Sequence, residues 1–231
     1  MRIGVQMPSI LHAWFDCDGT LYEQSPELVK QTDAVICKGI AVRTGRDLEG
    51  ITKEYGAKRA SQLTKLQIIA QYGFSKEEAY RLYDSVRPEE FITENSRLRE
   101  EFIKLLKQGT QVSVFSNSRR SKLYGILRKL GLDLDWFAFL LTGEEVPAKP
   151  DIEGYLRIIE RSRCSPGAIL FTGDNEKADT LPARNVGMNT LLLGHDAAVH
   201  FDDVNKTYHF RRRTVYDVSD VVNEIKQREN S

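Results

Sequence analysis

Residues 11–21 read Leu-His-Ala-Trp-Phe-Asp-Cys-Asp-Gly-Thr-Leu, a short apolar run that stops at two carboxylates separated by one residue. The run predicts a buried strand, and the polar residues after it predict a turn at the carboxyl end of that strand. Gly19 supplies the turn that Asp16 and Asp18 need in order to converge. Converging carboxylates are costly unless a cation neutralises them, and Mg²⁺ prefers one or two carboxylates together with waters and phosphate oxygens. This segment therefore predicts a magnesium site at a strand end.

The same order of strand and helix recurs along the chain. Further apolar or β-branched runs predict strands at Gln111–Phe115, Ala168–Phe171 and Thr190–Leu193. Helical spacing follows the first of these runs over Lys122–Leu130, and a helical segment up to Gly187 follows the second. Strands that alternate with helices imply a parallel sheet covered on both faces. The predicted fold class is therefore α/β, with a Rossmann-like, doubly wound core that binds ligands at the carboxyl ends of its strands.

Residues 22–94 show a helical pattern alone. Apolar residues three and four positions apart predict helices over Pro26–Val42, Ala60–Tyr72 and Lys76–Val86, and Ser75 with Glu78 forms a capping box. We expect a small all-α domain at 22–94, inserted into a catalytic core made of residues 1–21 and 95–231. The last helix of that core is expected over Val215–Lys226.

The net charge of zero gives no overall attraction to a polyanionic partner. The 231 residues include 33 basic and 33 acidic side chains, so neither nucleic acid nor a membrane surface is predicted to bind. The sequence has no run of about 18 apolar residues, and its N-terminus lacks the long apolar stretch of a signal peptide. The 3 cysteines stand at spacings that suit neither a disulfide framework nor a zinc site. We therefore expect a cytoplasmic protein.

Other polar side chains stand where they can complete the site. Asp174 and Asp179 form a second acidic cluster at another predicted strand end. Thr20 and Ser116 offer hydroxyl donors for phosphate oxygens, and Lys149 offers a positive charge. Together these residue types indicate a phosphate-binding metal site.

Four motifs, in this order along the chain, resemble those of the haloacid dehalogenase superfamily of phosphohydrolases. They are Asp16-Cys17-Asp18-Gly19-Thr20-Leu21, then Ser116-Asn117, then Lys149-Pro150-Asp151 with Tyr155 in the following helix, and finally Gly173-Asp174-Asn175-Glu176-Lys177-Ala178-Asp179 continued by Gly187-Met188. The helical segment directly after the first motif resembles the small cap domain of that family.

The resemblance implies a role for each acidic position. Asp16 would attack phosphorus and become an aspartyl-phosphate, while Asp18 would protonate the leaving alcohol and later deprotonate the hydrolytic water. Asp16, the backbone carbonyl of Asp18, and Asp174 would hold Mg²⁺. Asp179 would be a supporting or water-mediated ligand.

The resemblance also implies contacts with the transferred phosphoryl group. Ser116, together with Asn117 and Thr20, would bind its oxygens. Lys149 would neutralise both the nucleophile and the transferring group, so it joins Asp16 and Asp18 as an expected catalytic residue.

The second aspartate distinguishes reaction types within the superfamily. Dehalogenases of the family lack it, because carbon–halogen cleavage needs no acid for an alcohol leaving group, so Asp18 favours phosphoryl transfer. We therefore expect a Mg²⁺-dependent hydrolase of small phosphorylated metabolites, with phosphoglycolate, nucleotides and sugar phosphates as open substrate classes. A cap would favour such small substrates over macromolecules. A phosphomutase is the alternative enzyme, and a catalytically silent binding protein on the same fold is the alternative from another class.

Overall fold

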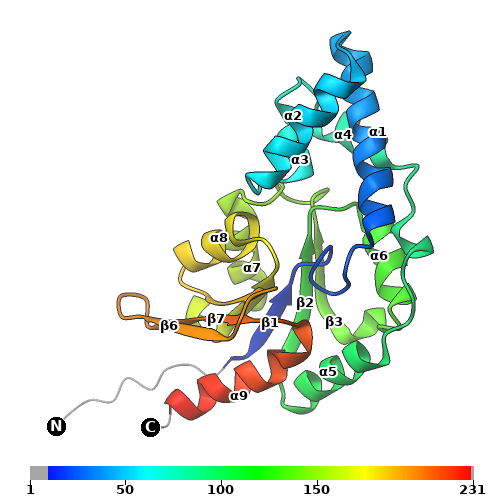
Figure 1. Cartoon of the computed structure of the whole chain (residues 1–231). Coiled ribbons are helices and arrows are strands. Elements are labelled where there is room, and N and C mark those ends of the chain that lie inside the picture. Colours follow the sequence, from blue (N-terminus) through cyan, green and yellow to red (C-terminus); the bar gives the residue numbers. More distant parts are fainter. Residues whose placement is uncertain (1–9, 230–231) are drawn as a thin grey trace, which may run out of the picture. The chain divides into compact units, whose positions relative to one another are not determined.

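The structure is a computed structural model that describes residues 10–229, and its chain divides into two compact units. One unit takes in the described residues up to Tyr22 and those from Glu94 onward, and the other is Glu23–Thr93. Residues 1–9 and 230–231, which we assigned to the core from the sequence, lie outside the described residues. Figure 1 shows the elements of each unit.

The first unit is built on a seven-stranded sheet in the order β3-β2-β1-β4-β5-β7-β6. In chain order the strands are β1 (His12–Phe15), β2 (Gln111–Ser116), β3 (Phe137–Thr142), β4 (Ile169–Gly173), β5 (Asn189–Leu193), β6 (Ala198–Asp202) and β7 (Thr207–Arg212). Every neighbouring pair is parallel except β6 with β7. The chain winds from β1 to β3 in one direction and from β4 to β5 in the other, after which the antiparallel pair β6–β7 adds to β5 through β7. This arrangement confirms the predicted α/β, doubly wound, Rossmann-like class.

Helices cover both faces of this sheet (Figure 1). One face carries α5 (Ser96–Lys107), α6 (Arg120–Lys129) and α9 (Val218–Glu229), and the other carries α7 (Ile152–Ser162) and α8 (Leu181–Asn185). Two consecutive residues of β1, Trp14 and Phe15, pack on opposite faces of the sheet, which explains the apolar run in the sequence. Phe15 packs against Phe102 of α5 with ring centroids 4.9 Å apart, while the indole of Trp14 donates to Oγ of Ser162 at the end of α7 over 2.9 Å. A strand buried on both faces is therefore mostly apolar, and the one polar residue of β1, His12, has a buried partner, since its Nε2 atom is 2.8 Å from Oγ of Ser113.

The four strands expected from the sequence are present as β1, β2, β4 and β5, and the expected final helix is present as α9 after one 3₁₀ turn. Strand β3 was not predicted. It begins directly after the 3₁₀ turn Leu134–Trp136, whose apolar residues run into those of the strand and hide its start. The β6–β7 hairpin was not predicted either, because β6 is largely exposed and lacks a buried apolar pattern.

The second unit consists of helices. They are α1 (Pro26–Thr44), α2 (Leu48–Ala60), α3 (Lys65–Ala70) and α4 (Lys76–Tyr83), followed by a 3₁₀ turn at Pro88–Glu90. The prediction of one helix over Ala60–Tyr72 is wrong, because α2 ends there and Gln62 takes a left-handed φ of 64°. Thr64 then starts α3 with a capping box, and the capping box predicted at Ser75 starts α4. Among residues 10–229, no helix combines the length and the apolar character that crossing a membrane requires.

Candidate functional site

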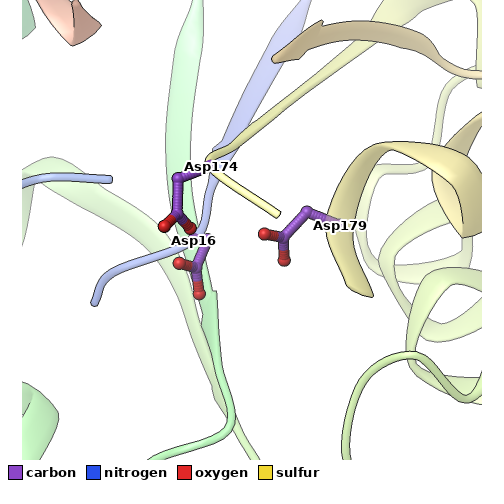
Figure 2. A group of neighbouring side chains, drawn as sticks. All are labelled: Asp16, Asp174 and Asp179. Carbon is purple, nitrogen blue, oxygen red and sulfur yellow. The ribbon is translucent and has the colours of Figure 1, made fainter. Parts of the chain in front are cut away.

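Three carboxylates meet at the carboxyl edge of the sheet. Asp16 follows β1, and both Asp174 and Asp179 follow β4, the strand that pairs with β1. Asp16 extends this pairing, because its backbone N–H donates to the carbonyl of Thr172 over 2.8 Å. One oxygen from each of the three carboxylates lies within 4.8 Å of the others (Figure 2). The fold thus joins two acidic clusters that are far apart in the sequence.

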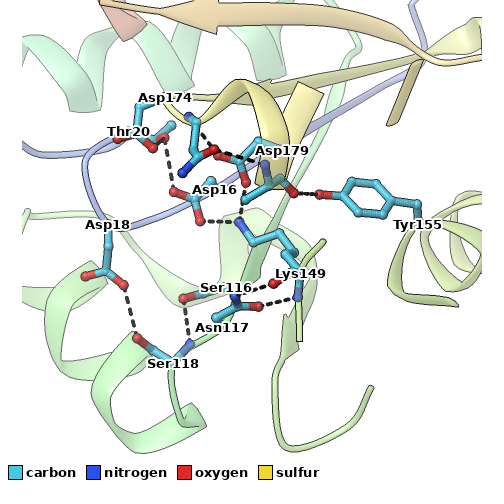
Figure 3. A network of polar contacts seen from close by, with 12 residues as sticks. Asp16, Asp18, Thr20, Ser116, Asn117, Ser118, Lys149, Tyr155, Asp174 and Asp179 are labelled. Carbon is cyan, nitrogen blue, oxygen red and sulfur yellow. Dashed lines mark hydrogen bonds and ion pairs between the residues drawn. The ribbon is translucent and has the colours of Figure 1, made fainter. Parts of the chain in front are cut away.

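Lys149 lies between two of these carboxylates (Figure 3). Its Nζ atom is 2.5 Å from Oδ1 of Asp16 and 2.6 Å from Oδ1 of Asp179, and the residue is 3% exposed. Burial alone would lower the pKa of Lys149, but the charges of Asp16 and Asp179 outweigh burial and hold that pKa above its usual value. The ammonium group is therefore a permanent positive charge in the site.

Burial and repulsion raise the pKa values of two carboxyl groups. Loss of water raises the pKa of Asp16 well above its ordinary value, against the opposing effect of Lys149, and the neighbouring carboxylates raise it further. Asp174 is exposed as a residue, but its carboxylate faces the acidic group, where desolvation and then the charge of Asp179 raise its pKa to about 6. Three ionised carboxylates against one ammonium leave two negative charges, which one divalent cation balances. Their hard oxygen donors suit Mg²⁺, so these residues fit the predicted metal.

We expect Mg²⁺ to raise the melting temperature more at about pH 7.5 than at about pH 5. A pKa raised by folding favours the protonated native state. The stabilising contribution of such a group is therefore complete below its unfolded pKa and is lost as the pH rises through its folded pKa, which is about 6 for Asp174 and is also raised for Asp16. A cation held there would favour the ionised groups and would relieve their repulsion, so its effect on the melting temperature should grow over the same pH range.

The readout for this prediction is the difference between melting curves with and without MgCl₂, at matched ionic strength. Absolute stability is unsuitable because His12 and His209, whose pKa values burial lowers to about 4, destabilise the fold as the pH falls. An equal Mg²⁺ effect at both pH values would contradict the expectation.

The turn after Asp16 depends on Gly19. Its φ is +89°, and a Cβ atom at this position would lie 2.4 Å from Oδ2 of Asp174. Glycine therefore permits both the left-handed turn and the close approach of the Asp174 carboxylate. The next residue, Thr20, has its Oγ1 atom 3.2 Å from Oδ2 of Asp16 and 3.5 Å from Oδ1 of Asp174. The expected contact of Thr20 with a phosphoryl oxygen stays a prediction.

Two residues that follow one another at the end of β2 have different partners. Ser116 is buried, and its Oγ atom accepts the backbone N–H of Ser118 over 3.1 Å. Asn117 makes two hydrogen bonds with the backbone of Lys149, donating from Nδ2 over 3.1 Å and accepting at Oδ1 over 2.7 Å. Asn117 thereby holds the loop that carries Lys149, next to the cis peptide bond to Pro150. Contacts of Ser116 and Asn117 with phosphate stay predictions.

Asp179 is held by the chain segment on which it lies. The segment Glu176–Thr180 is a single π-helical turn, a feature that often marks functional sites. Oδ2 of Asp179 accepts the backbone N–H of Asn175 over 3.0 Å, and the hydroxyl of Tyr155 donates to the carbonyl of Ala178. The carboxylate of Asp179 is thus fixed both by its own turn and by Lys149.

Asp18 lies apart from the group of three carboxylates. Its Oδ2 atom accepts the hydroxyl of Ser118 over 3.0 Å, and its Oδ1 atom accepts the hydroxyl of Tyr22 over 2.5 Å (Figure 3 draws the first contact). The side chain of Asp18 is therefore not one of the grouped ligands, and the metal contact that we expected through its backbone carbonyl stays a prediction.

Sequence reasoning did not identify Ser118 and Tyr22 as partners of Asp18. Ser118 lies two positions beyond Ser116, at the same predicted strand end, so a second hydroxyl next to the phosphate-binding motif was the available signal. For Tyr22 the signal was its position four residues after Asp18, across a turn that Gly19 makes tight.

The fold and the site together define a class of protein. A doubly wound α/β core carries acidic groups and a buried lysine at the carboxyl edge of its parallel sheet. Within that class the sequence profile of the haloacid dehalogenase-like hydrolases matches residues 11–187. The chain belongs to this family, as the four motifs indicated.

Solved structures share the same fold. A HAD phosphatase from Thermococcus onnurineus is 18% identical, with a TM-score of 0.59 over 91% of this chain and 97% of that chain. A HAD-superfamily hydrolase of subfamily IA from Geobacter sulfurreducens PCA is 22% identical, with a TM-score of 0.58 over 92% of this chain and 100% of the other. A 2-haloacid dehalogenase from Pseudomonas syringae pv. tomato DC3000 is 20% identical, with a TM-score of 0.56 over 94% and 99%. At these identities the likeness establishes the fold alone. No curated protein matches the sequence significantly.

Proposed function

We propose that this chain hydrolyses small phosphomonoesters with the help of Mg²⁺, through an aspartyl-phosphate on Asp16. The observation that carries the proposal is the buried carboxylate of Asp16, which lies 2.5 Å from Nζ of Lys149 and in one group with Asp174 and Asp179. A carboxylate beside a permanent positive charge is a nucleophile placed where negative charge must be stabilised. Membership of a hydrolase family supports a hydrolytic reaction.

The proposed reaction has two steps. First, an oxygen of Asp16 forms a bond to phosphorus while the bond from phosphorus to the leaving oxygen breaks, and that oxygen takes a proton from Asp18. Second, water forms a bond to phosphorus and gives a proton to Asp18, while the bond from phosphorus to Asp16 breaks. Inorganic phosphate leaves, and both aspartates return to their starting forms. Lys149 would stabilise the charge on the phosphoryl oxygens in both steps.

The metal would be held by Asp16, Asp174 and the backbone carbonyl of Asp18, with Asp179 in a supporting position. When bound, Mg²⁺ would supply positive charge that keeps the carboxylates ionised and polarises the phosphoryl group. Ser116 would donate its hydroxyl to a phosphoryl oxygen, because its Oγ atom already accepts the N–H of Ser118 and its proton is not used in that bond.

Asp18 favours phosphate esters over haloacids as substrates. Halide leaves without a proton, whereas an alkoxide leaving group needs a general acid. In this chain a second carboxylate stands two residues after Asp16 and accepts two hydroxyl hydrogen bonds. Such a group has a use in phosphoryl transfer and none in carbon–halogen cleavage.

We also propose that the helical unit Glu23–Thr93 serves as a cap that encloses the substrate. This unit leaves the core directly after Tyr22, four residues beyond Asp18, so its attachment lies next to the reacting groups. A cap of this kind excludes water and limits the substrate to small metabolites such as phosphoglycolate, nucleoside monophosphates or sugar phosphates.

The test is release of inorganic phosphate from a panel of these metabolites, with MgCl₂ and with EDTA. We expect release that requires Mg²⁺. Isomerisation of a sugar phosphate without phosphate release would instead identify a mutase, and chloride release from 2-chloropropionate a dehalogenase. If no compound were turned over in the presence of Mg²⁺, the result would favour the alternative of a catalytically silent binding protein on this fold.

A further inference from the structure

The carboxylate of Asp18 receives one hydrogen bond on each of its oxygens. Ser118 donates to Oδ2 over 3.0 Å and Tyr22 donates to Oδ1 over 2.5 Å. The two donors come from different segments, one at the end of β2 and the other beyond the turn that follows β1. A carboxylate held at one oxygen can still rotate, whereas donors on both oxygens fix the plane of the group.

Each donor is itself held in place. The backbone N–H of Ser118 donates to Oγ of Ser116, so the segment after β2 connects the expected phosphate contact with Asp18. Tyr22 is only 9% exposed, and a β-bridge joins it to Asp18 across the turn. The orientation of Asp18 is therefore set by hydrogen bonds from groups that are themselves held, although Asp18 and Ser118 are only half-buried.

We infer that Ser118 and Tyr22 are positioning residues for Asp18, which fix the carboxylate for its proton transfers. The inference rests on the proposed function, in which Asp18 gives a proton to the leaving oxygen and later takes one from water. Proton transfer requires a donor and an acceptor within hydrogen-bond reach, so freedom of rotation at Asp18 lowers the rate.

This role predicts a dependence on the leaving group. An alkyl phosphate loses a strongly basic oxygen that needs the proton of Asp18. The p-nitrophenolate oxygen of p-nitrophenyl phosphate leaves as a stable anion and needs none. Loosening Asp18 should therefore slow phosphoryl transfer to Asp16 from the alkyl ester and spare transfer from the aryl ester. Water attack on the aspartyl-phosphate needs Asp18 with either substrate.

The experiment compares Tyr22→Phe and Ser118→Ala with wild type, in Mg²⁺, on glycerol 3-phosphate and on p-nitrophenyl phosphate. We expect kcat/KM for the alkyl ester to fall by about 10-fold or more in each variant, as partial loss of general acid catalysis implies. For the aryl ester kcat and KM should fall together, because the intermediate accumulates, so that kcat/KM stays within about threefold.

Matched variants separate this role from a general loss of structure. Tyr124→Phe and Ser121→Ala remove hydroxyls from a half-buried and an exposed position on α6, and both should keep the wild-type ratio of the two kcat/KM values. Ser118→Thr retains a hydroxyl and should restore most of the rate on the alkyl ester. Melting curves check that each variant is folded.

Two results would overturn the inference. An equal loss of kcat/KM on both esters would show that the hydrogen bonds only support the structure, and an unchanged kcat/KM on the alkyl ester would show that Asp18 needs neither donor. Failure of the proposed function has a different signature, since wild type itself would then release no phosphate from either ester.

Discussion

Replacement Asp16→Asn is expected to reduce phosphate release by at least about 10³-fold, below detection in a colorimetric assay. The amide cannot form the aspartyl-phosphate, and neither of the other carboxylates should take over, because Asp174 would be a metal ligand and Asp179 is bonded to Lys149 and to the backbone of Asn175. What remains is binding without the covalent step.

The same variant should fold. Burial and like charges raise the pKa of Asp16, so its ionised form costs stability at neutral pH, and the neutral amide removes that cost while Lys149 keeps Asp179 as a partner. We expect a metal-free melting temperature no lower than that of wild type. The matched control is Asp135→Asn, an exposed aspartate that should leave both activity and stability unchanged. Turnover close to wild type in the Asp16 variant would reject the proposed mechanism.

The positions of the acidic residues follow from the sequence because one physical rule connects them. Parallel strands that are buried on both faces read as continuous apolar runs, and the polar residue at which a run stops marks the carboxyl end. Asp16, Ser116 and Asp174 each stand at such a stop, so their meeting at one edge of the sheet needs only the knowledge that their strands are neighbours. In the structure β2 and β4 flank β1.

Hydrogen-bond partners do not follow from this rule. The contacts of Asn117 with the backbone of Lys149 span 32 positions, and the contact of Ser118 with Asp18 spans 100. Both contacts depend on the exact positions of side chains in the loops that follow the strands. The spacing of apolar residues carries no information about those positions. The phosphate contact expected of Asn117 stays a prediction, and the hydrogen bonds of its side chain with the backbone of Lys149 were not foreseen from the sequence.

The helical unit shows a second limit. A run of apolar residues spaced for a helix continues through residues 60–72, but the backbone breaks at Gln62, where φ is 64°. Neither proline nor glycine marks this break. The sequence feature that marks the start of a new helix is the capping box of Thr64 with Gln67, at the start of α3. This feature is a weaker indication than the apolar spacing that continues through residues 60–72.

Replacement Lys149→Met is expected to lower the metal-free free energy of unfolding by about 3–5 kcal/mol. Lys149 is the partner of two carboxylates that are themselves buried, Asp16 and Asp179. Methionine matches the length of lysine but carries no charge, so both carboxylates lose their counter-charge without a large change in volume. Urea unfolding at neutral pH measures the loss, and activity should fall below detection because the transferred group loses its stabilising cation.

The exposed pair of Lys206 with Asp203 provides the matched control. The two side chains are 58% and 86% exposed, and Nζ of Lys206 is 3.7 Å from the carboxylate, so Lys206→Met should cost less than about 1 kcal/mol. Addition of Asp179→Asn to Lys149→Met should recover part of the lost stability, since it removes one of the two carboxylates left without a partner. Mg²⁺ should likewise stabilise the Lys149 variant more than wild type, because the cation then supplies the only positive charge among the three carboxylates. If Lys149→Met were as stable as wild type without metal, the buried ion pairs would contribute no net stability, and the acidic group would have to be protonated in the folded chain.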